Sequence, residues 1–319
     1  MKTFVKNDLI IWILLVTVLW YLFVFGFLEA AATSNKVLSL VGLDQTSDGM
    51  KFIISMYLGT IVPFIGILVY TGVTKRNRFV FRSFLPGYQR NGMKTLLQGL
   101  LVGFIMNFGC IVCALVHGDI KIYYDFALSQ IPLMLFALVC VFIQSTSEEL
   151  WCRCFLYDRI NVHYPLWIAV VINGSLFGLM HLGNDGISAL ALADLIICGL
   201  SYSLLRWYSG SIWTCFGIHT MWNFTQNFLF GLPNSGLVSE ASVFHLDAAT
   251  GISNWVYSYE FGVEGGVPAV FIDLVLVAVI LWCARRDGRL GELLESRESK
   301  GEMPVMTNHE TPAVVFPEQ

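Results

Sequence analysis

The stretch Gln144–Arg153 holds the residues best suited to chemistry. Two adjacent carboxylates, Glu148 and Glu149, follow directly on an apolar run, Ile131–Ile143, that is typical of a membrane helix. An ionised side chain at the centre of a bilayer costs at least ~3 kcal/mol, so acids placed there usually face a bundle interior or a wet cavity. We therefore predict a functional site at this point of the chain.

The two glutamates are predicted to have different partners. Consecutive residues of an α-helix point about 100° apart, so both carboxylates cannot face one cavity equally. Glu149 and Arg153 have the i,i+4 spacing that favours an ion pair within a helix, which leaves Glu148 for a partner elsewhere. The alternative is that both acids are interfacial charges at a helix end that faces the cytoplasm.

Two histidines are the candidate partners of Glu148. Phe177 and His181 are four residues apart and share one helical face, and His219 and Asn223 repeat this spacing two apolar segments later. Glutamate and histidine together can hold a water molecule and take its proton, which is general-base catalysis. An asparagine side chain can donate a hydrogen bond to a developing oxyanion. The set therefore predicts a hydrolytic site.

The same side chains can instead ligate a metal ion. Glu148, His181 and His219 are of the types that bind Zn²⁺ in hydrolytic sites, where a fourth position stays open. The sequence leaves both options open. Asp194, in another apolar segment, is a further buried acid, either a supporting partner of the site or a polar packing residue.

Signatures of other membrane-embedded hydrolases are absent from the sequence. It contains no HExxH motif of the kind that binds zinc on one helix, and no GxSG motif that would mark a serine nucleophile. Tyr157-Asp158 has no GxGD partner, so a pair of catalytic aspartates is not indicated either. The glutamate and histidine set remains as the candidate.

The composition predicts an all-α, polytopic membrane helix bundle. Of 319 residues, 56% are hydrophobic and 13% charged, and the mean hydropathy is +0.66, whereas a soluble domain carries roughly 25% charged residues. The eight cysteines fall mostly in apolar runs, where free cysteine packs as a small hydrophobe, so no disulfide framework is expected. Counting about 20 apolar residues per crossing, we predict eight transmembrane helices, at 9–28, 52–73, 96–116, 130–150, 166–183, 187–206, 211–230 and 267–284.

These helices divide the chain into five parts. Residues 1–129 hold the first three helices and their loops, and residues 130–230 form the predicted catalytic core. Residues 231–266 form an extracytoplasmic loop, which is either a lid or a solvated loop, and residues 267–286 contain the last helix. The charged tail 287–319 lacks apolar periodicity and is predicted to be disordered.

The distribution of Lys and Arg predicts the orientation in the membrane. Cytoplasmic segments carry an excess of these residues. With both termini cytoplasmic, only three of the 19 Lys and Arg fall in outside segments, namely Lys36, Lys51 and Lys121. We expect a multi-pass protein with both termini in the cytoplasm, in the plasma membrane of a bacterium.

The motifs taken together resemble a known family, the CPBP family of CAAX proteases and bacteriocin-processing enzymes, which is also called Abi. Each motif alone is weak, but three of them in an eight-helix context are specific. The resemblance covers roughly residues 130–230. The motifs that carry it, in chain order and on separate helices, are Glu148-Glu149-x-x-x-Arg153, Phe177-x-x-x-His181 and His219-x-x-x-Asn223.

The resemblance implies an all-α intramembrane endopeptidase in which Glu148 activates a water molecule. His181, His219 and Asn223 would position that water or stabilise the oxyanion. A bound divalent metal such as zinc and a glutamate-activated water alone both remain open. One departure from the family is Cys154, which stands where a glycine commonly follows the motif arginine. The motif residues that carry over in a supporting role are Glu149, Arg153 and Phe177.

The function expected is that of a membrane-embedded protease. Its partners would be a hydrophobic or lipidated peptide or protein substrate and membrane lipid, and no nucleic acid. One alternative is a non-catalytic membrane protein such as a bacteriocin-immunity factor. Another is a proton-coupled transporter, since intramembrane Glu and His also build proton relays.

The depth of the candidate residues conflicts with a shared site. At 1.5 Å per residue, His181 lies about 22 Å along a helix that begins near Leu166, whereas Glu148 lies near the inner end of its own helix. The groups meet only if the helix at 166–183 starts in the cytoplasm, the helix at 130–150 lies deeper than its apolar run indicates, or the helices tilt strongly.

Overall fold

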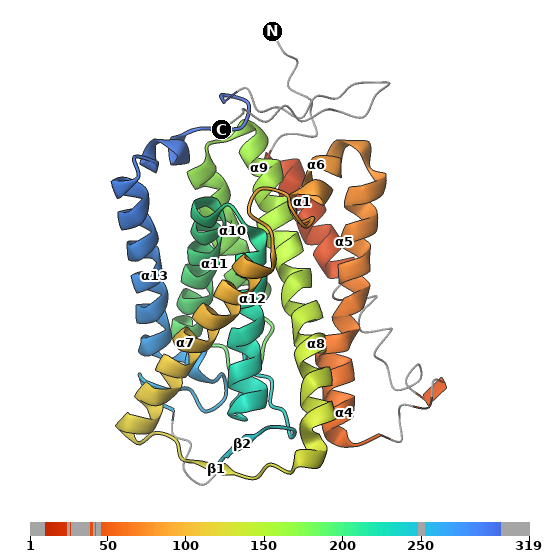
Figure 1. Ribbon diagram of the computed structural model, residues 1–319, viewed down its shortest axis with the longest axis vertical. Helices are drawn as coiled ribbons and strands as arrows, with labels where there is room; N and C mark the ends of the chain where they lie inside the picture. The colour runs from red at the N-terminus through yellow and green to blue at the C-terminus, as the bar shows by residue number, and fades with distance from the viewer. Residues whose placement is uncertain are drawn as a thin grey trace.

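The computed structural model describes residues 10–23, 26, 39–40, 42, 46–247 and 253–300. The described part is mostly helical, and each of the eight helices predicted from the sequence coincides, at least in part, with a helix of the structure (Figure 1). Of the first predicted helix, residues 9, 24–25 and 27–28 lie outside the described part.

The helices are interrupted in places by short turns of tighter or wider helix. Those named η3, η7 and η8 are π-helical, and the other η elements are 3₁₀-helical. In chain order the helices are α1 (Ile10–Tyr21), α4 (Asp48–Phe52), η3 (Ile53–Tyr57), η4 (Leu58–Thr60), α5 (Ile61–Val73), η5 (Lys75–Asn77), α6 (Arg78–Ser83), α7 (Met93–His117), η6 (Leu128–Gln130), α8 (Ile131–Glu149), η7 (Leu150–Leu156), α9 (Tyr157–His163), α10 (Leu166–Met180), α11 (Ala189–Ser209), α12 (Ile212–Phe224), η8 (Thr225–Leu229), η9 (Val263–Gly265), α13 (Val267–Arg286) and η10 (Leu290–Leu294). Two short strands, β1 (Ile122–Tyr124) and β2 (Phe244–Leu246), pair antiparallel.

Five described helical stretches are long and apolar enough to cross a membrane, so the chain is a polytopic helical membrane protein. Two further apolar helices, Ile10–Leu19 and Leu166–Met180, are shorter, and the predicted helix at 211–230 falls outside this set. The five stretches are Asp48–Val73, Met93–His117, Leu128–His163, Ala189–Ser209 and Val267–Arg286.

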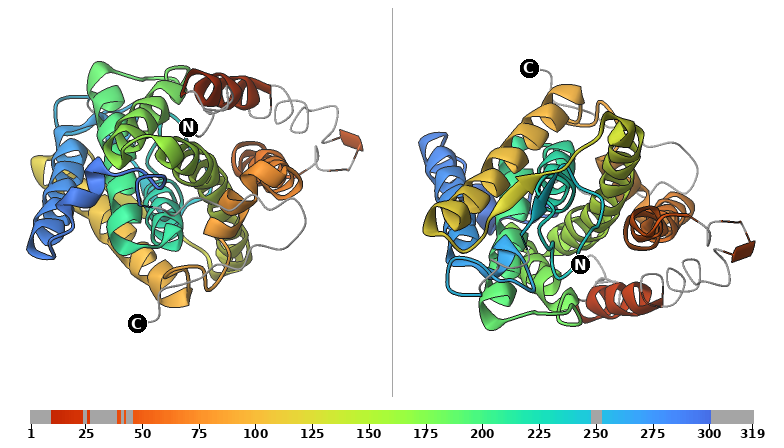
Figure 2. Two further views of the ribbon diagram at one scale, coloured as in Figure 1. Left: turned by 90° about the horizontal axis from the view of Figure 1, so that it is seen from above. Right: turned by 90° about the horizontal axis from the view of Figure 1, so that it is seen from below.

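Helix α12 lies inside the bundle and organises the helices around it. It packs against α7 on one side and α8 on the other, while α11 packs against both α10 and α13 (Figure 2). Helix α5 packs against α8 on the outer side. Figure 1 shows α6, α9 and the end of α13 at one end of the bundle and the β1–β2 ribbon at the other.

The turn between α11 and α12 shows how local sequence sets the helix ends. Gly210 adopts a φ of +66°, the left-handed conformation that glycine tolerates and that commonly ends a helix. Ser211 then caps α12, because its side chain accepts a hydrogen bond from the backbone N–H of Trp213. The Ser-Gly-Ser sequence is therefore a helix stop followed by a helix start.

Glycines bring α7 and α12 into backbone contact. A Cβ atom on Gly103 would clash with the carbonyl oxygen of Ile218, and a Cβ atom on Gly217 would clash with the carbonyl oxygen of Leu96. Small residues at membrane helix interfaces let two backbones approach closely and gain dispersion contacts. This contact fixes α12, which carries two of the motif residues.

The helix predicted to end near residue 150 continues well past that point. Helix α8 runs into η7 and α9, so one helical stretch spans Leu128–His163. Residues 151–162 are buried, and Asp158 within them is paired with Arg206 of α11. Polar residues that resemble a surface segment are therefore part of the core. Glu148 lies inside this helix rather than at its end, which resolves the conflict over depth.

The loop 231–266 is a packed cap at one end of the bundle rather than a solvated loop. Leu232, Tyr257 and Phe261 within it are fully buried. The Asn227 side chain donates hydrogen bonds to backbone carbonyls of the loop, at 3.1 Å to Leu232 and 2.9 Å to Leu237. Residues 248–252 lie outside the described part.

The beginning of the C-terminal tail differs from the sequence prediction. Residues 287–300 form a short 3₁₀ turn and pack on the bundle, where Arg297 donates a hydrogen bond to Asp158 at 2.8 Å. The buried carboxylate of Asp158 needs cations, and the tail provides one of them. The rest of the tail, residues 301–319, lies outside the described part.

The close contact of α7 and α12 predicts a cost for any side chain at the crossing. Gly103→Ala is expected to lower the free energy of unfolding by about 1–3 kcal/mol, because the added methyl group meets backbone that cannot move aside. Gly291→Ala, where a Cβ has open space around it, is the matched control. Thermal unfolding in detergent measures both, and equal stability of the two variants would contradict the close packing.

Candidate active site

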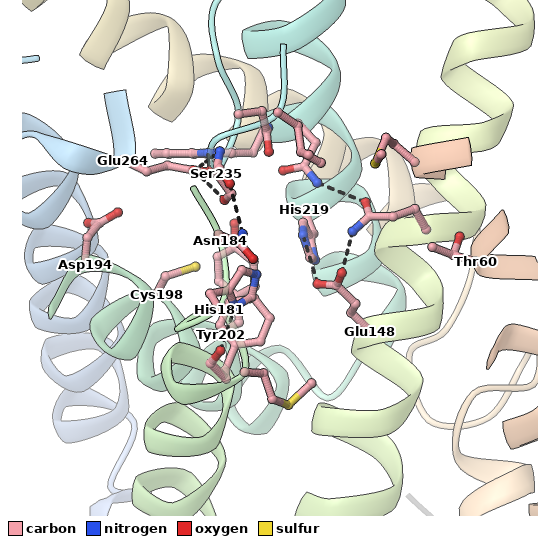
Figure 3. A pocket seen from close by; sticks show the side chains of 18 of the residues that line it. Thr60, Glu148, His181, Asn184, Asp194, Cys198, Tyr202, His219, Ser235 and Glu264 are labelled. Carbon is pink, nitrogen blue, oxygen red and sulfur yellow. Dashed lines mark hydrogen bonds and ion pairs between the residues drawn. The ribbon is translucent and has the colours of Figure 1, made fainter. Parts of the chain in front are cut away.

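Five of the motif residues, Glu148, Phe177, His181, His219 and Asn223, line one cavity of about 230 Å³ between the helices (Figure 3). Segments from the whole length of the chain contribute to its walls. They include Tyr57 and Thr60 from η3 and η4, Gln144 and Glu148 from α8, Phe177 and His181 at the end of α10, Asp194, Cys198 and Tyr202 from α11, His219, Trp222 and Asn223 from α12, Asn234, Ser235 and Glu264 from the cap, and Asp273 from α13.

Glu148 lies beside His219 in this cavity. Its Oε2 atom is 3.8 Å from Nε2 of His219. This distance is too long for a direct hydrogen bond, but one water molecule bonded to both atoms can bridge it. Its Oε1 atom accepts a hydrogen bond from the Gln144 side chain at 2.6 Å. The Glu148 side chain is 17% exposed, so a substrate or water in the cavity can reach it.

Glu149 points instead into the protein and forms a buried charge cluster. Its Oε1 atom accepts hydrogen bonds from Nη1 of Arg153 and from Nδ1 of His219, both at 2.9 Å. The side chains of Glu149 and Arg153 have no exposed surface. The i,i+4 ion pair is therefore present as predicted, and the reading of both acids as interfacial charges is wrong. Because a carboxylate can only accept, the hydrogen of His219 is on Nδ1 and its Nε2 is directed to Glu148.

The ring of Phe177 packs the charged groups and the two histidines together. The Arg153 guanidinium carbon lies 4.1 Å from the ring centroid, a distance typical of a cation–π contact. The centroids of His181 and His219 are 5.0 and 6.1 Å from that of Phe177. Nδ1 of His181 is 2.8 Å from the carbonyl oxygen of Phe177 and donates to it, which leaves Nε2 free toward the cavity.

Asn223 is connected to Glu148 through a side chain that the sequence analysis did not single out. The Asn223 amide donates to Oε1 of Gln144 at 3.0 Å, and Gln144 in turn donates to Glu148. Gln144 lies four residues before Glu148 and so shares its helical face. This spacing was the available signal for its role.

Several lining residues come from outside the predicted core at 130–230. Tyr57 reaches the cavity from the N-terminal helices, and Glu264 and Asp273 reach it from the cap and the last helix. Sequence spacing does not show contacts between such distant segments. The one signal was that the loop holding Glu264 carries several acids and no Lys or Arg.

Glu264 is buried although it belongs to the cap. Its Oε2 atom accepts from the backbone N–H of Ser235 at 2.8 Å and from the Ser235 hydroxyl at 2.6 Å, and its Oε1 atom accepts from the Trp222 indole at 2.8 Å. Burial raises the pKa of the Glu264 carboxyl above its ordinary value, and the hydrogen bonds and nearby His181 oppose that rise.

Glu148, His181 and His219 do not form a metal-ligand set. In the described ranges, no three His, Cys, Asp or Glu side chains converge closely enough to hold a metal ion. Zinc ligands lie about 2.0–2.2 Å from a shared ion and need a common centre. The predicted set of Glu148, His181 and His219 does not fit this requirement, so the geometry gives no support to a metalloprotease.

Fold and cavity together define a polytopic helical membrane protein with a glutamate–histidine site among its helices. Residues 130–225 match a protein-family model named Rce1-like. Its description is type II CAAX prenyl endopeptidase Rce1-like. This segment is thus a domain of the CPBP (Abi) family, as the motifs indicated, and it contains every motif residue from Glu148 to Asn223. No curated protein and no solved structure matches the chain.

The buried ion pair predicts a large loss of stability when one partner is removed. Arg153→Leu is expected to lower the free energy of unfolding by about 3–5 kcal/mol, because Glu149 is left buried without its cation. Lys51→Leu breaks an exposed ion pair with Asp48 and is expected to change the free energy of unfolding by no more than about 1 kcal/mol. Thermal denaturation compares the two, and a small effect of Arg153→Leu would mean that Glu149 is not held as a carboxylate.

Proposed function

We propose that the protein is an intramembrane endopeptidase that hydrolyses a peptide bond near a hydrophobic or lipid-modified segment. The observation that carries this proposal is the placement of the Glu148 carboxylate and the His219 imidazole within reach of one water molecule, in a cavity between apolar helices. The family match supports the same class, since its description names an endopeptidase.

In the proposed reaction Glu148 is the general base. A water molecule between its Oε2 atom and Nε2 of His219 gives a proton to the carboxylate while the water oxygen attacks the carbonyl carbon of the substrate. The C–N bond then breaks and the Glu148 carboxyl returns the proton to the leaving nitrogen. The products are a carboxylic acid and an amine, and Glu148 is again ionised.

The neighbouring residues position the water and the oxyanion in this proposal. Glu149 holds His219 so that the lone pair of Nε2 can accept the second hydrogen of the water. Asn223 uses one amide hydrogen on Gln144 and has a second that can be donated to the oxyanion of the tetrahedral intermediate. His181 directs Nε2 into the cavity and can bind the substrate carbonyl from the other side.

The substrate class follows from the surroundings of the site. Apolar helices enclose the cavity, so a hydrophobic or lipidated peptide can approach it from the membrane lipid. The description of the matching family favours the C-terminal peptide of a prenylated protein. Bacteriocin leaders and hydrophobic propeptides are chemically compatible with the same cavity.

We also propose that both termini face the cytoplasm of a bacterial cell. Figure 1 shows α6, α9 and the end of α13 at the same end of the bundle, and these segments are rich in Lys and Arg. The opposite end carries β1, β2 and the cap, which has no Lys or Arg. An excess of Lys and Arg at one end of a membrane helix bundle is typical of the cytoplasmic side.

The proposal predicts that catalysis depends on the carboxylate of Glu148. Glu148→Gln is expected to reduce cleavage at least about 100-fold, because the amide cannot take a proton from water. Glu240→Gln, which changes an exposed acid of the cap, is the control and should retain activity. Mass spectrometry of products from farnesylated CAAX-type peptides and from hydrophobic leader peptides, with purified protein in lipid nanodiscs, measures both.

Other outcomes of this experiment separate the competing functions. A fully active Glu148→Gln protein refutes the glutamate-dependent peptidase. If the wild-type protein cleaves no peptide and both variants keep the wild-type phenotype in cells, a non-catalytic immunity factor is favoured. Flux driven by a pH gradient in vesicles identifies a transporter.

A further inference from the structure

Helix α11 presents to the cavity an acid that the proposed mechanism does not use. Asp194, Cys198 and Tyr202 follow one another at i, i+4 and i+8 and all line the cavity, so this face of the helix is turned toward it. Asp194 is only 2% exposed, yet its Oδ1 atom has no hydrogen-bond partner. A buried polar atom left without a partner is costly, and it points to a ligand that is bound during function.

Two further carboxyl groups line the same side of the cavity. Asp273 of α13 is 2% exposed and accepts one hydrogen bond, from the Ser201 hydroxyl of α11 at 3.0 Å. Glu264 is held by Ser235 and Trp222 as described. Asp194, Asp273 and Glu264 together are called the acidic wall. Figure 3 shows Asp194 and Glu264 on one side of the cavity and Glu148 on the other.

No described Lys or Arg side chain is available to pair with the acidic wall, and the titratable bases that line the cavity are His181 and His219. Among the described residues that line the cavity there is no Lys or Arg. Arg153, which is buried nearby, is already paired with Glu149. Buried carboxylates are stabilised by a hydrogen-bonded positive charge, and among the described residues no Lys or Arg supplies one to Asp194.

The arrangement of the acids indicates which kind of cation they can bind. A metal ion requires ligands that converge within about 2.0–2.6 Å of one centre, and no such convergence exists in the described part of the chain. An ammonium or guanidinium group instead offers several N–H donors, each about 2.7–2.9 Å from its acceptor, so it can reach carboxylates that are further apart. An organic cation therefore fits the wall better than a metal.

We propose that the acidic wall binds a lysine or arginine side chain of the peptide substrate, within a few residues of the bond that is cleaved. This inference rests on the proposed function. His181 lies between the wall and Glu148 in the cavity, so a peptide whose scissile carbonyl is at Glu148 extends past His181 to Asp194. The wall thus gives the enzyme a preference for a basic residue beside a hydrophobic or lipidated segment.

The test measures binding separately from cleavage. Glu148→Gln protein in nanodiscs is titrated with fluorescent farnesylated peptides that carry either lysine or norleucine, in turn, at each of four positions flanking the expected scissile bond. Norleucine keeps the aliphatic chain and lacks the ammonium group. We expect lysine to improve the affinity at least tenfold at one position.

Variants of the acidic wall test whether it causes this preference. Adding Asp194→Asn, or separately Asp273→Asn, to the Glu148→Gln protein should bring the ratio of the lysine and norleucine affinities close to one. Adding Asp125→Asn, which changes an exposed acid and is the control, should leave that ratio unchanged.

The outcomes distinguish a failure of this inference from a failure of the proposed function. Equal affinity for lysine and norleucine peptides at all four positions, including no measurable binding of either, overturns the acidic wall as a binding site. A lysine preference that survives both Asn variants also overturns it. If wild-type protein cleaves the peptides without a lysine preference, the peptidase stands and the wall does not. If lysine binding is preferred but wild-type protein cleaves nothing, the wall stands and the peptidase does not.

Discussion

The buried ion pair between Glu149 and Arg153 is the interaction on which the arrangement of the site depends. Removing two charges from water costs several kcal/mol per ion, and this cost is offset only by close geometry and further hydrogen bonds. Here the same carboxylate oxygen binds both Arg153 and His219, and the guanidinium lies over the ring of Phe177. Three helices are thereby connected at one point. The orientation of His219 beside Glu148 follows from this connection.

Helix geometry explains how two adjacent glutamates take different roles. Because neighbouring side chains diverge by about 100° on a helix, Glu148 reaches the cavity while Glu149 reaches Arg153 behind it. The helix changes to a π-helical turn immediately after Glu149, a similar turn follows α12, and a third, η3, ends at Tyr57. The turn η3 lines the cavity through Tyr57, and the other two begin just after the lining residues Glu148 and Asn223, in keeping with the frequent occurrence of π-helical turns near functional sites.

The cavity has an uneven distribution of charge. Carboxyl groups from α8, α11, α13 and the cap line it, whereas the cations of this region are either histidines or are paired elsewhere. A general base gains from a position where water and a substrate carbonyl can reach it. The opposite wall, with Asp194 unpartnered, is better suited to recognition than to proton transfer. In the two proposals, catalysis by Glu148 and recognition by the acidic wall take place on opposite sides of one small cavity.

The helices, the motif residues and the Glu149–Arg153 pair could be predicted from the sequence, because hydrophobic runs and i,i+4 spacing are local properties of the chain. The sequence did not show that the helix of Glu148 continues to residue 163, since the polar residues that follow resemble a surface segment until Asp158 meets Arg206.

The packing of the helices establishes which distant side chains join the motifs. Gln144 links Asn223 to Glu148, and Glu264 and Asp273 enter the cavity from the cap and the last helix. Such contacts arise when helices pack, and neither spacing nor composition records which faces will meet.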